Sequence, residues 1–176
     1  MARVPPVDYE KADAATQAEF DRITSTQGRM TNMKATLAHS LPALSALMEW
    51  YPLREEVHKF LEPRATMLFV HAISSATDCL ICSTFFRRLL IDAGENPDDF
   101  AMNEVEQLVV DYGRQLVRDA NQVSDELYAR LARHFTPPQI VALTAFGGMM
   151  IATNVFNNAL RVDLDGYLEA YRRAGR

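Results

Sequence analysis

Few residues in this sequence can form a covalent cross-link or bind a metal ion. It contains two cysteines and four histidines in 176 residues. A chain of this length buries enough apolar surface to fold without disulfide staples. A structural zinc ion usually needs four cysteine or histidine ligands, often in two pairs, and only one cysteine pair is present. We therefore expect no metal ion and no other cofactor.

Positive charge and phosphate-binding loops are also scarce. Lys and Arg number 18 against 23 Asp and Glu, which gives a formal net charge of -5. Nucleic-acid binding depends on clustered Lys and Arg, so we expect no nucleic-acid partner. No glycine-rich phosphate loop is present either.

Long apolar runs are missing as well. No run approaches the roughly 18 apolar residues that span a bilayer, and residues 1–6 lack the apolar core of a signal peptide. We expect a cytoplasmic protein with no membrane partner. In that reducing compartment, a Cys-x-x-Cys pair is more often catalytic, redox-sensing or metal-binding than a structural disulfide.

The periodicity of apolar residues predicts an all-α fold. No segment shows sustained two-residue alternation, whereas apolar residues recur at helical spacing along most of the chain. We interpret residues 1–30 as an arm and a covering helix, and residues 31–176 as one helical domain. The signals expected at helix boundaries are Pro52 as a kink or break, Asp78 as the cap of a helix over residues 79–92, and Thr136–Gln139 as a capping box.

The only cysteines, Cys79 and Cys82, form a Cys-x-x-Cys pair eight residues after His71. The pair has three possible roles: a redox dithiol, part of a metal site, or two small apolar core residues. A thioredoxin-like fold is excluded because the chain has no strands to supply its βαβ unit. A redox dithiol is the leading interpretation, because three-residue spacing on a helix places both sulfurs on one face.

Several segments resemble the alkylhydroperoxidase D and carboxymuconolactone decarboxylase superfamily. The resemblance spans residues 31–167 and rests on the following segments: Thr36-Leu-Ala-His39-Ser, the Cys-x-x-Cys pair, Phe135-Thr-Pro-Pro-Gln-Ile-Val-Ala-Leu and Asn154-Val-Phe-Asn157. It implies a helical fold with a central buried helix before the cysteine helix, and assembly into a homo-oligomer. It also implies a small hydroperoxide or lactone as substrate and, for a peroxidase, an unknown dithiol reductant.

In the peroxidase branch of that superfamily, a glutamate and a histidine relay the thiol proton. The resemblance implies that Cys82 attacks the peroxide and Cys79 resolves the product. The relay positions, twelve residues before Cys79 and four after Cys82, hold Met67 and Phe86, which cannot accept a proton. His71, one helical turn after Met67, is the candidate replacement base; its alternative role is that of a buried core histidine.

His58 and Glu55 on the preceding helix are further candidates for the base. If no base has moved into the site, the dithiol belongs to a catalytically degenerate relative with a redox-sensing or structural role.

The function expected from these patterns is thiol-dependent reduction of a hydroperoxide through a dithiol–disulfide cycle of Cys79 and Cys82. The alternative within the superfamily is a lyase that acts on a small carboxylated lactone. That reaction needs no cysteine pair, but its substrate requires cationic and histidine groups, and the sequence shows no cluster of them.

Overall fold

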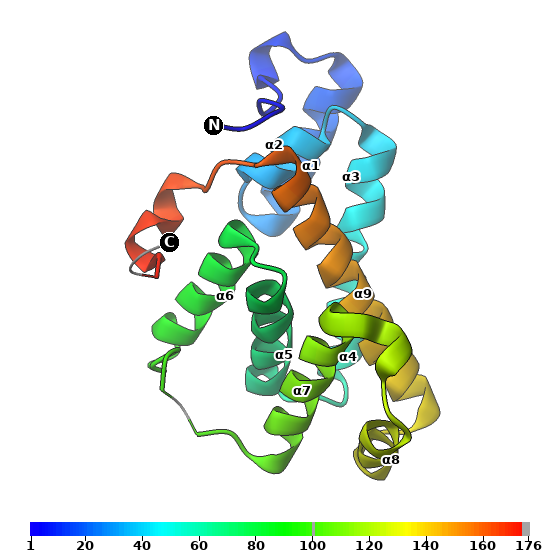
Figure 1. The fold of residues 1–176 in the computed structure, drawn as a ribbon. Helices are drawn as coiled ribbons and strands as arrows, with labels where there is room; N and C mark the ends of the chain where they lie inside the picture. The colour runs from blue at the N-terminus through cyan, green and yellow to red at the C-terminus, as the bar shows by residue number, and fades with distance from the viewer. Residues whose placement is uncertain (100, 174–176) are drawn as a thin grey trace.

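The computed structural model describes residues 1–99 and 101–173, and this part of the chain contains helices and loops but no strand (Figure 1). The all-α prediction is confirmed. The α-helices are α1 (Ala14–Gln27), α2 (Asn32–Leu37), α3 (Leu41–Met48), α4 (Trp50–His58), α5 (Pro63–Ala76), α6 (Leu80–Asp92), α7 (Glu104–Asp119), α8 (Asp125–His134) and α9 (Pro137–Leu160). The short 3-10 helices are η1 (Tyr9–Lys11), η2 (Ala120–Gln122) and η3 (Gly166–Tyr171).

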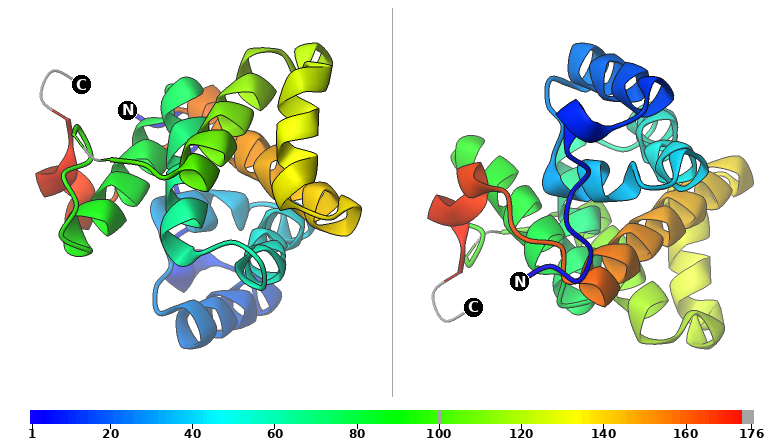
Figure 2. Two further views of the ribbon diagram at one scale, coloured as in Figure 1. Left: turned by 90° about the horizontal axis from the view of Figure 1, so that it is seen from below. Right: turned by 90° about the horizontal axis from the view of Figure 1, so that it is seen from above.

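Helix α5 is the centre of the fold. It packs most extensively against α7 and α6, and it also contacts α9. Phe69 and Ile73 on α5 are fully buried, because the helix carries little charge after its first turn. The two views in Figure 2 show η3 beside α6, which closes the fold on the side away from α8.

The N-terminal helices form a second core cluster, in which Phe20 and Ile23 of α1 pack with residues of α2 and α3. The arm before them is held by two backbone hydrogen bonds. Arg3 N donates to Leu160 O at 2.8 Å, and Val7 N donates to Ala35 O at 3.0 Å. The division of the chain at residue 31 stays a prediction.

Two helix boundaries differ from those expected. Pro52 neither kinks nor divides a helix, because the break falls at Glu49 and places Pro52 in the first turn of α4. A proline is tolerated there, since the N–H groups of the first turn have no intrahelical acceptor. The capping box before α9 forms as expected, with Thr136 N donating to Gln139 Oε1 at 2.8 Å.

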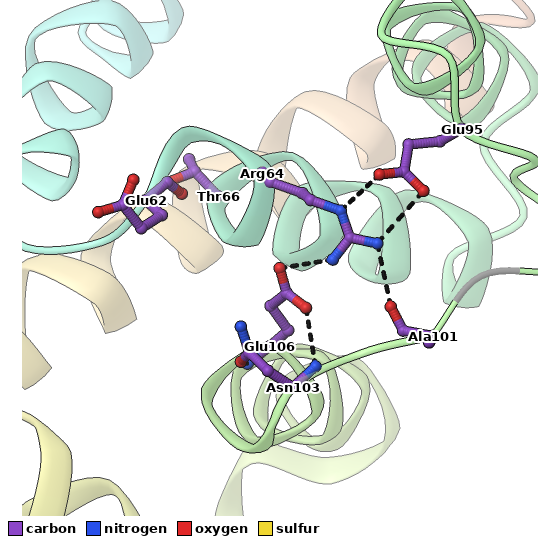
Figure 3. Close-up of polar contacts among 7 residues, drawn as sticks. All are labelled: Glu62, Arg64, Thr66, Glu95, Ala101, Asn103 and Glu106. Carbon is purple, nitrogen blue, oxygen red and sulfur yellow. Dashed lines mark hydrogen bonds and ion pairs between the residues drawn. The ribbon is translucent and has the colours of Figure 1, made fainter.

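An ion-pair cluster joins the starts of α5 and α7 to the segment after α6 (Figure 3). Arg64 Nε donates to Glu95 Oε1 at 2.7 Å, and Arg64 Nη1 pairs with Glu106 Oε1. Glu106 is only 5% exposed, and its other oxygen accepts from Asn103 N at 2.9 Å in a capping box. The cluster secures the end of α5 that lies away from the cysteines.

Helix α9 is long and apolar enough to cross a bilayer, judged by length and composition alone, with a mean hydropathy of 1.5 in its most apolar window. The same properties are typical of the core helix of a globular protein. In this fold α9 packs against α4 and α5, and it buries Asn154 and Asn157 toward the molecule.

Substitutions at two adjacent glycines, Gly147 and Gly148, can test the packing of α9 against α5. A Cβ on Gly147 would lie 2.9 Å from both Phe69 Cζ and Leu116 Cδ1, whereas a Cβ on Gly148 meets nothing within 4 Å. Phe69 is fully buried and has no room to move. We expect Gly147→Ala to lower the free energy of unfolding by about 1 to 3 kcal/mol through overpacking. Gly148→Ala, the matched control, should raise it by about 0.5 to 1 kcal/mol through helix propensity.

Chemical denaturation of both variants measures the difference. Equal effects from the two substitutions would contradict the close approach of α5 and α9.

Candidate active site

A tight junction between α5 and α6 presents the two cysteines. Cys79 N donates to Ser74 O at 3.0 Å and Asp78 N donates to Ser75 O at 3.2 Å, the two bonds of a Schellman motif. The motif requires a left-handed residue, and Asp78 supplies it with φ 54°. The prediction that Asp78 caps α6 is therefore wrong: Cys79 is the N-cap, and Asp78 belongs to the end of α5.

Both thiols point toward one amide group on α9. Asn157 Nδ2 lies 3.3 Å from Cys82 Sγ and 3.9 Å from Cys79 Sγ. The same nitrogen lies 3.5 Å from Met33 Sδ on α2. Cys79 is fully buried, and Cys82 is 6% exposed. The sulfurs are free thiols that share one hydrogen-bond donor in an otherwise apolar environment.

A hydrogen bond between the two thiols shifts their pKa values in opposite directions. The bond from Cys82 lowers the pKa of Cys79, with help from the backbone N–H groups of Cys82 and Ile81 and from Asn157. The same bond, together with burial, raises the pKa of Cys82. The shared interaction therefore shifts the two pKa values in opposite directions, that of Cys79 downward and that of Cys82 upward.

Cys82 also lines a cavity of about 360 Å³ that Cys79 does not reach. Its walls come from α2, α3, α4, α6, α9 and η3, together with the end of α1 and the loop before α2. The aromatic lining residues are Trp50, Tyr51, Phe85, Phe86 and Tyr167. Trp50 and Phe86 lie 6.2 Å apart between ring centroids, and Phe85 meets Phe86 edge-on at 5.2 Å. A flat apolar molecule in this cavity would contact both the aromatic rings and the Cys82 sulfur.

The lining of the cavity carries more cationic than anionic side chains although the whole chain is acidic, and Arg54 and Arg88 are paired with Glu55 and Asp92. Four cationic side chains line it against one carboxylate, Asp165; the cations are Arg29, Lys34, Arg54 and Arg88. Lys34 is only 4% exposed, and burial lowers its pKa to about 8, partly offset by Asp165. Burial also raises the pKa of Asp165. A cavity of this kind favours an anionic ligand.

Buried polar atoms without a partner concentrate around the same cavity. Among the residues that the structure describes, five buried side-chain atoms have no hydrogen-bond partner. Three belong to residues that line the cavity: Gln27 Oε1, Trp50 Nε1 and Asp165 Oδ2. Buried polar groups are normally hydrogen-bonded, so the three atoms are available to a ligand.

Met67 and Phe86, which hold the two relay positions implied by the resemblance, lie in different surroundings. Phe86 is buried and lines the cavity beside Cys82. Met67 packs with Leu90 and Val110 in a separate apolar cluster.

His71 lines a different cavity from Cys82. This smaller cavity, of about 80 Å³, is formed by His71 with Ser83, Arg87 and Asp98. Ser83 and Arg87 lie on another face of α6 than Cys82 and Phe86, because helix positions four apart share a face and neighbouring positions do not. Burial lowers the pKa of His71 to about 4, and the positive charge of Arg87 contributes. The structure does not bring His71 together with the thiols.

Glu55 and His58, the other candidates for the base, are exposed on α4, and neither lines the thiol cavity. Glu55 Oε1 accepts from Arg54 at 2.7 Å. The zinc interpretation gains no support from geometry: within residues 1–99 and 101–173, no group of three or more His, Cys, Asp or Glu side chains could hold a metal ion.

The sequence alone did not identify the four cationic side chains that line the cavity. They lie on separate elements, so no local pattern groups them; the folded chain brings the cations together, but no histidine lines the cavity with them. One local signal was present: Lys34 stands between the apolar residues Met33 and Ala35.

No protein-family model matches the sequence, and no curated protein matches it. Solved structures do match. One is an uncharacterized peroxidase-related protein from Ralstonia eutropha JMP134, described as an alkylhydroperoxidase AhpD core. It gives a TM-score of 0.76 at 16% identity, over 95% of this chain and 94% of that chain. A peroxidase-related protein from Silicibacter sp. TM1040 gives 0.73 at 17% identity, over 96% of both chains.

The debrominase Bmp8 has a TM-score of 0.72 at 16% identity, over 96% of this chain and 95% of that chain. Identities this low establish shared architecture and nothing about the reaction. The chain therefore has the helical fold of the alkylhydroperoxidase D core.

Proposed function

We propose that this protein reduces hydroperoxides through a dithiol–disulfide cycle of Cys79 and Cys82. The observation that carries the proposal is the hydrogen-bonded thiol pair, one member of which lines a cavity. Two proteins with the same fold are named as peroxidase-related, which supports the assignment.

In the proposed reaction, Cys79 takes the proton of Cys82. Cys82 lines the cavity and has a raised pKa, whereas the hydrogen bond from Cys82 lowers the pKa of Cys79. As Cys82 Sγ attacks the terminal oxygen of the hydroperoxide, its proton passes to Cys79. The O–O bond breaks, Cys82 becomes a sulfenic acid, and the alkoxide takes a proton from solvent to leave as the alcohol.

The second step forms the disulfide. Cys79 Sγ attacks Cys82 Sγ, and the hydroxyl group of the sulfenic acid leaves with the Cys79 proton as water. An external dithiol then reduces the disulfide by thiol–disulfide exchange and is itself oxidised. Each cycle converts one hydroperoxide and one dithiol to alcohol, water and disulfide.

A lyase that acts on a carboxylated lactone is the second candidate, and the cations of the cavity are the observation that favours it. Its reaction does not consume thiols, so the cysteine variants below separate the two. The debrominase Bmp8 shares the fold, which illustrates that the architecture supports more than one reaction. A catalytically degenerate relative is the outcome if the thiols do not react.

We further propose a cytoplasmic homo-oligomer. Exposed apolar residues on α9, among them Val141 at 68% and Val155 at 59%, support self-association.

The first test follows the thiols. We expect one equivalent of cumene hydroperoxide to remove both free thiols of the reduced protein and to release one equivalent of alcohol. Cys82→Ser should abolish both changes. Cys79→Ser should react slowly and leave a sulfenic acid on Cys82 that dimedone traps. Thiol titration and mass spectrometry measure these outcomes, and two unreactive thiols in the native protein would refute the proposal.

The second test concerns Asn157, the shared donor. Its amide favours the thiolate, so Asn157→Leu should raise the pKa of the reactive pair. A hydrogen bond to a charged group contributes about 1.5 to 3 kcal/mol, which predicts an upward shift of about one unit or more in the pH–rate profile. The control is Asn158→Ala, which removes a bond to Thr77 O but none to sulfur. An unchanged profile would show that Asn157 does not stabilise the thiolate.

The third test concerns His71, whose role as the base stays a prediction. If the Cys79 thiolate takes the proton, His71→Ala should leave the rate of thiol oxidation within about twofold, because His71 faces another cavity. Stopped-flow oxidation at several pH values measures this. A large loss of rate that is restored by exogenous imidazole would identify His71 as the base instead.

A further inference from the structure

Lys34 is a buried cation for which the fold supplies little compensation. Its ammonium group donates to Arg29 O at 3.3 Å and lies 5.3 Å above the Tyr51 ring. Among the residues that the structure describes, no carboxylate oxygen lies within 4.0 Å of Lys34 Nζ. Charged groups buried to this extent are normally paired, and Lys34 lines the cavity that Cys82 opens into.

The arginines of the cavity are arranged around aromatic rings. The Arg29 guanidinium lies 4.0 Å from the centroid of Tyr167, and that of Arg54 lies 5.4 Å from Trp50. Arg54 is paired with Glu55, whereas no carboxylate neutralises Lys34 in the same way. The cavity therefore combines flat apolar walls with one desolvated positive charge.

Asp165, the one carboxylate among the described residues that line the cavity, does not fill this role. Asp165 Oδ1 accepts from Asn32 N at 2.9 Å, and Asp165 Oδ2 has no partner. Trp50 Nε1 is a buried donor without an acceptor. A ligand that brings one negative group and a hydrogen-bond acceptor would satisfy Lys34 and Trp50 together.

We propose that the cavity binds a small aromatic anion, with its negative group on Lys34, its ring against Trp50 and Phe86, and its reacting group facing Cys82. The volume of about 360 Å³ is within the range of small-molecule sites. This inference rests on the proposed function: it identifies the preferred hydroperoxide as one on an anionic aryl compound.

A purely structural role for Lys34 makes the opposite prediction for stability. If Lys34 only supports the fold, Lys34→Met should destabilise the protein. If Lys34 is kept for a ligand, removing an undercompensated buried charge while retaining the apolar stem should raise Tm, and it should weaken anion binding at the same time.

Binding can be measured through Trp50, the only tryptophan in the chain, which lines the cavity. The probes are 4-nitrobenzoate and its neutral counterpart 4-nitrobenzamide, both of which quench tryptophan fluorescence. We expect the wild-type protein to bind the benzoate at least about tenfold more tightly than the amide, as an ion pair in a desolvated site predicts. Lys34→Met should remove this preference and leave amide binding within about twofold.

The matched control is Lys59→Met, which makes the same change in net charge at an exposed lysine paired with Glu56. It should leave both affinities unchanged. Equal binding of the two probes by wild-type protein would overturn the proposal without any variant. Equal losses in Lys34→Met and Lys59→Met would also overturn it, since they indicate a general charge effect. Lys34→Gln provides a second variant if Lys34→Met does not fold.

The same titration on Cys82→Ser separates this inference from the proposed reaction. Preference for the benzoate in a protein whose thiols ignore hydroperoxides would retain the ligand class and reject the peroxidase. Oxidation of the thiols by cumene hydroperoxide without any preference for the benzoate would retain the peroxidase and reject the ligand class.

Discussion

The hydrogen bond from Cys79 N to Ser74 O is the constraint on which the site depends. It ends α5 in a Schellman motif and, at the same residue, begins α6. Because Asp78 takes the left-handed conformation, the chain reverses within three residues and places Cys79 at the N-cap and Cys82 one turn later. The buried side chains of α5 and the amide of Asn157 then hold the thiols between two helices. A longer or looser junction would separate the sulfurs from their shared donor.

Two electrostatic features distinguish this site from the relay implied by the superfamily resemblance. The first is the pairing of the thiols, in which Cys79 becomes the more acidic member while Cys82 remains the accessible one. Acidity and access are thus divided between two residues, and the proposed reaction depends on proton transfer between them. The second is the surplus of positive charge in the cavity of an acidic protein, with Lys34 as its most buried member. The proposed ligand would compensate the charge of Lys34, which is buried with little compensation from the fold.

The fold and the reaction of this protein have to be inferred from different observations. Solved structures with 15 to 17% identity cover almost the whole chain, and their names include both peroxidase-related proteins and a debrominase. A helical scaffold can be conserved in shape while its reaction changes, because the reaction depends on the few groups of the site. The reaction has to be argued from the sulfurs, their donor and the charges around them.

The sequence by itself determined the helical fold, the capping box at Thr136 and the spacing of the Cys-x-x-Cys pair, because periodicity, capping and short spacings are local properties. The same local signals led to the wrong cap at Asp78, since an aspartate before a helix is usually a cap and only the turn geometry reveals a left-handed residue. The tertiary structure alone decided which groups meet. It brought Asn157 to Cys82 across 75 residues, assembled cations from separate elements around Cys82, and placed His71 of α5 at a cavity that Cys82 does not line. These contacts depend on how helices cross, which no spacing along the chain encodes.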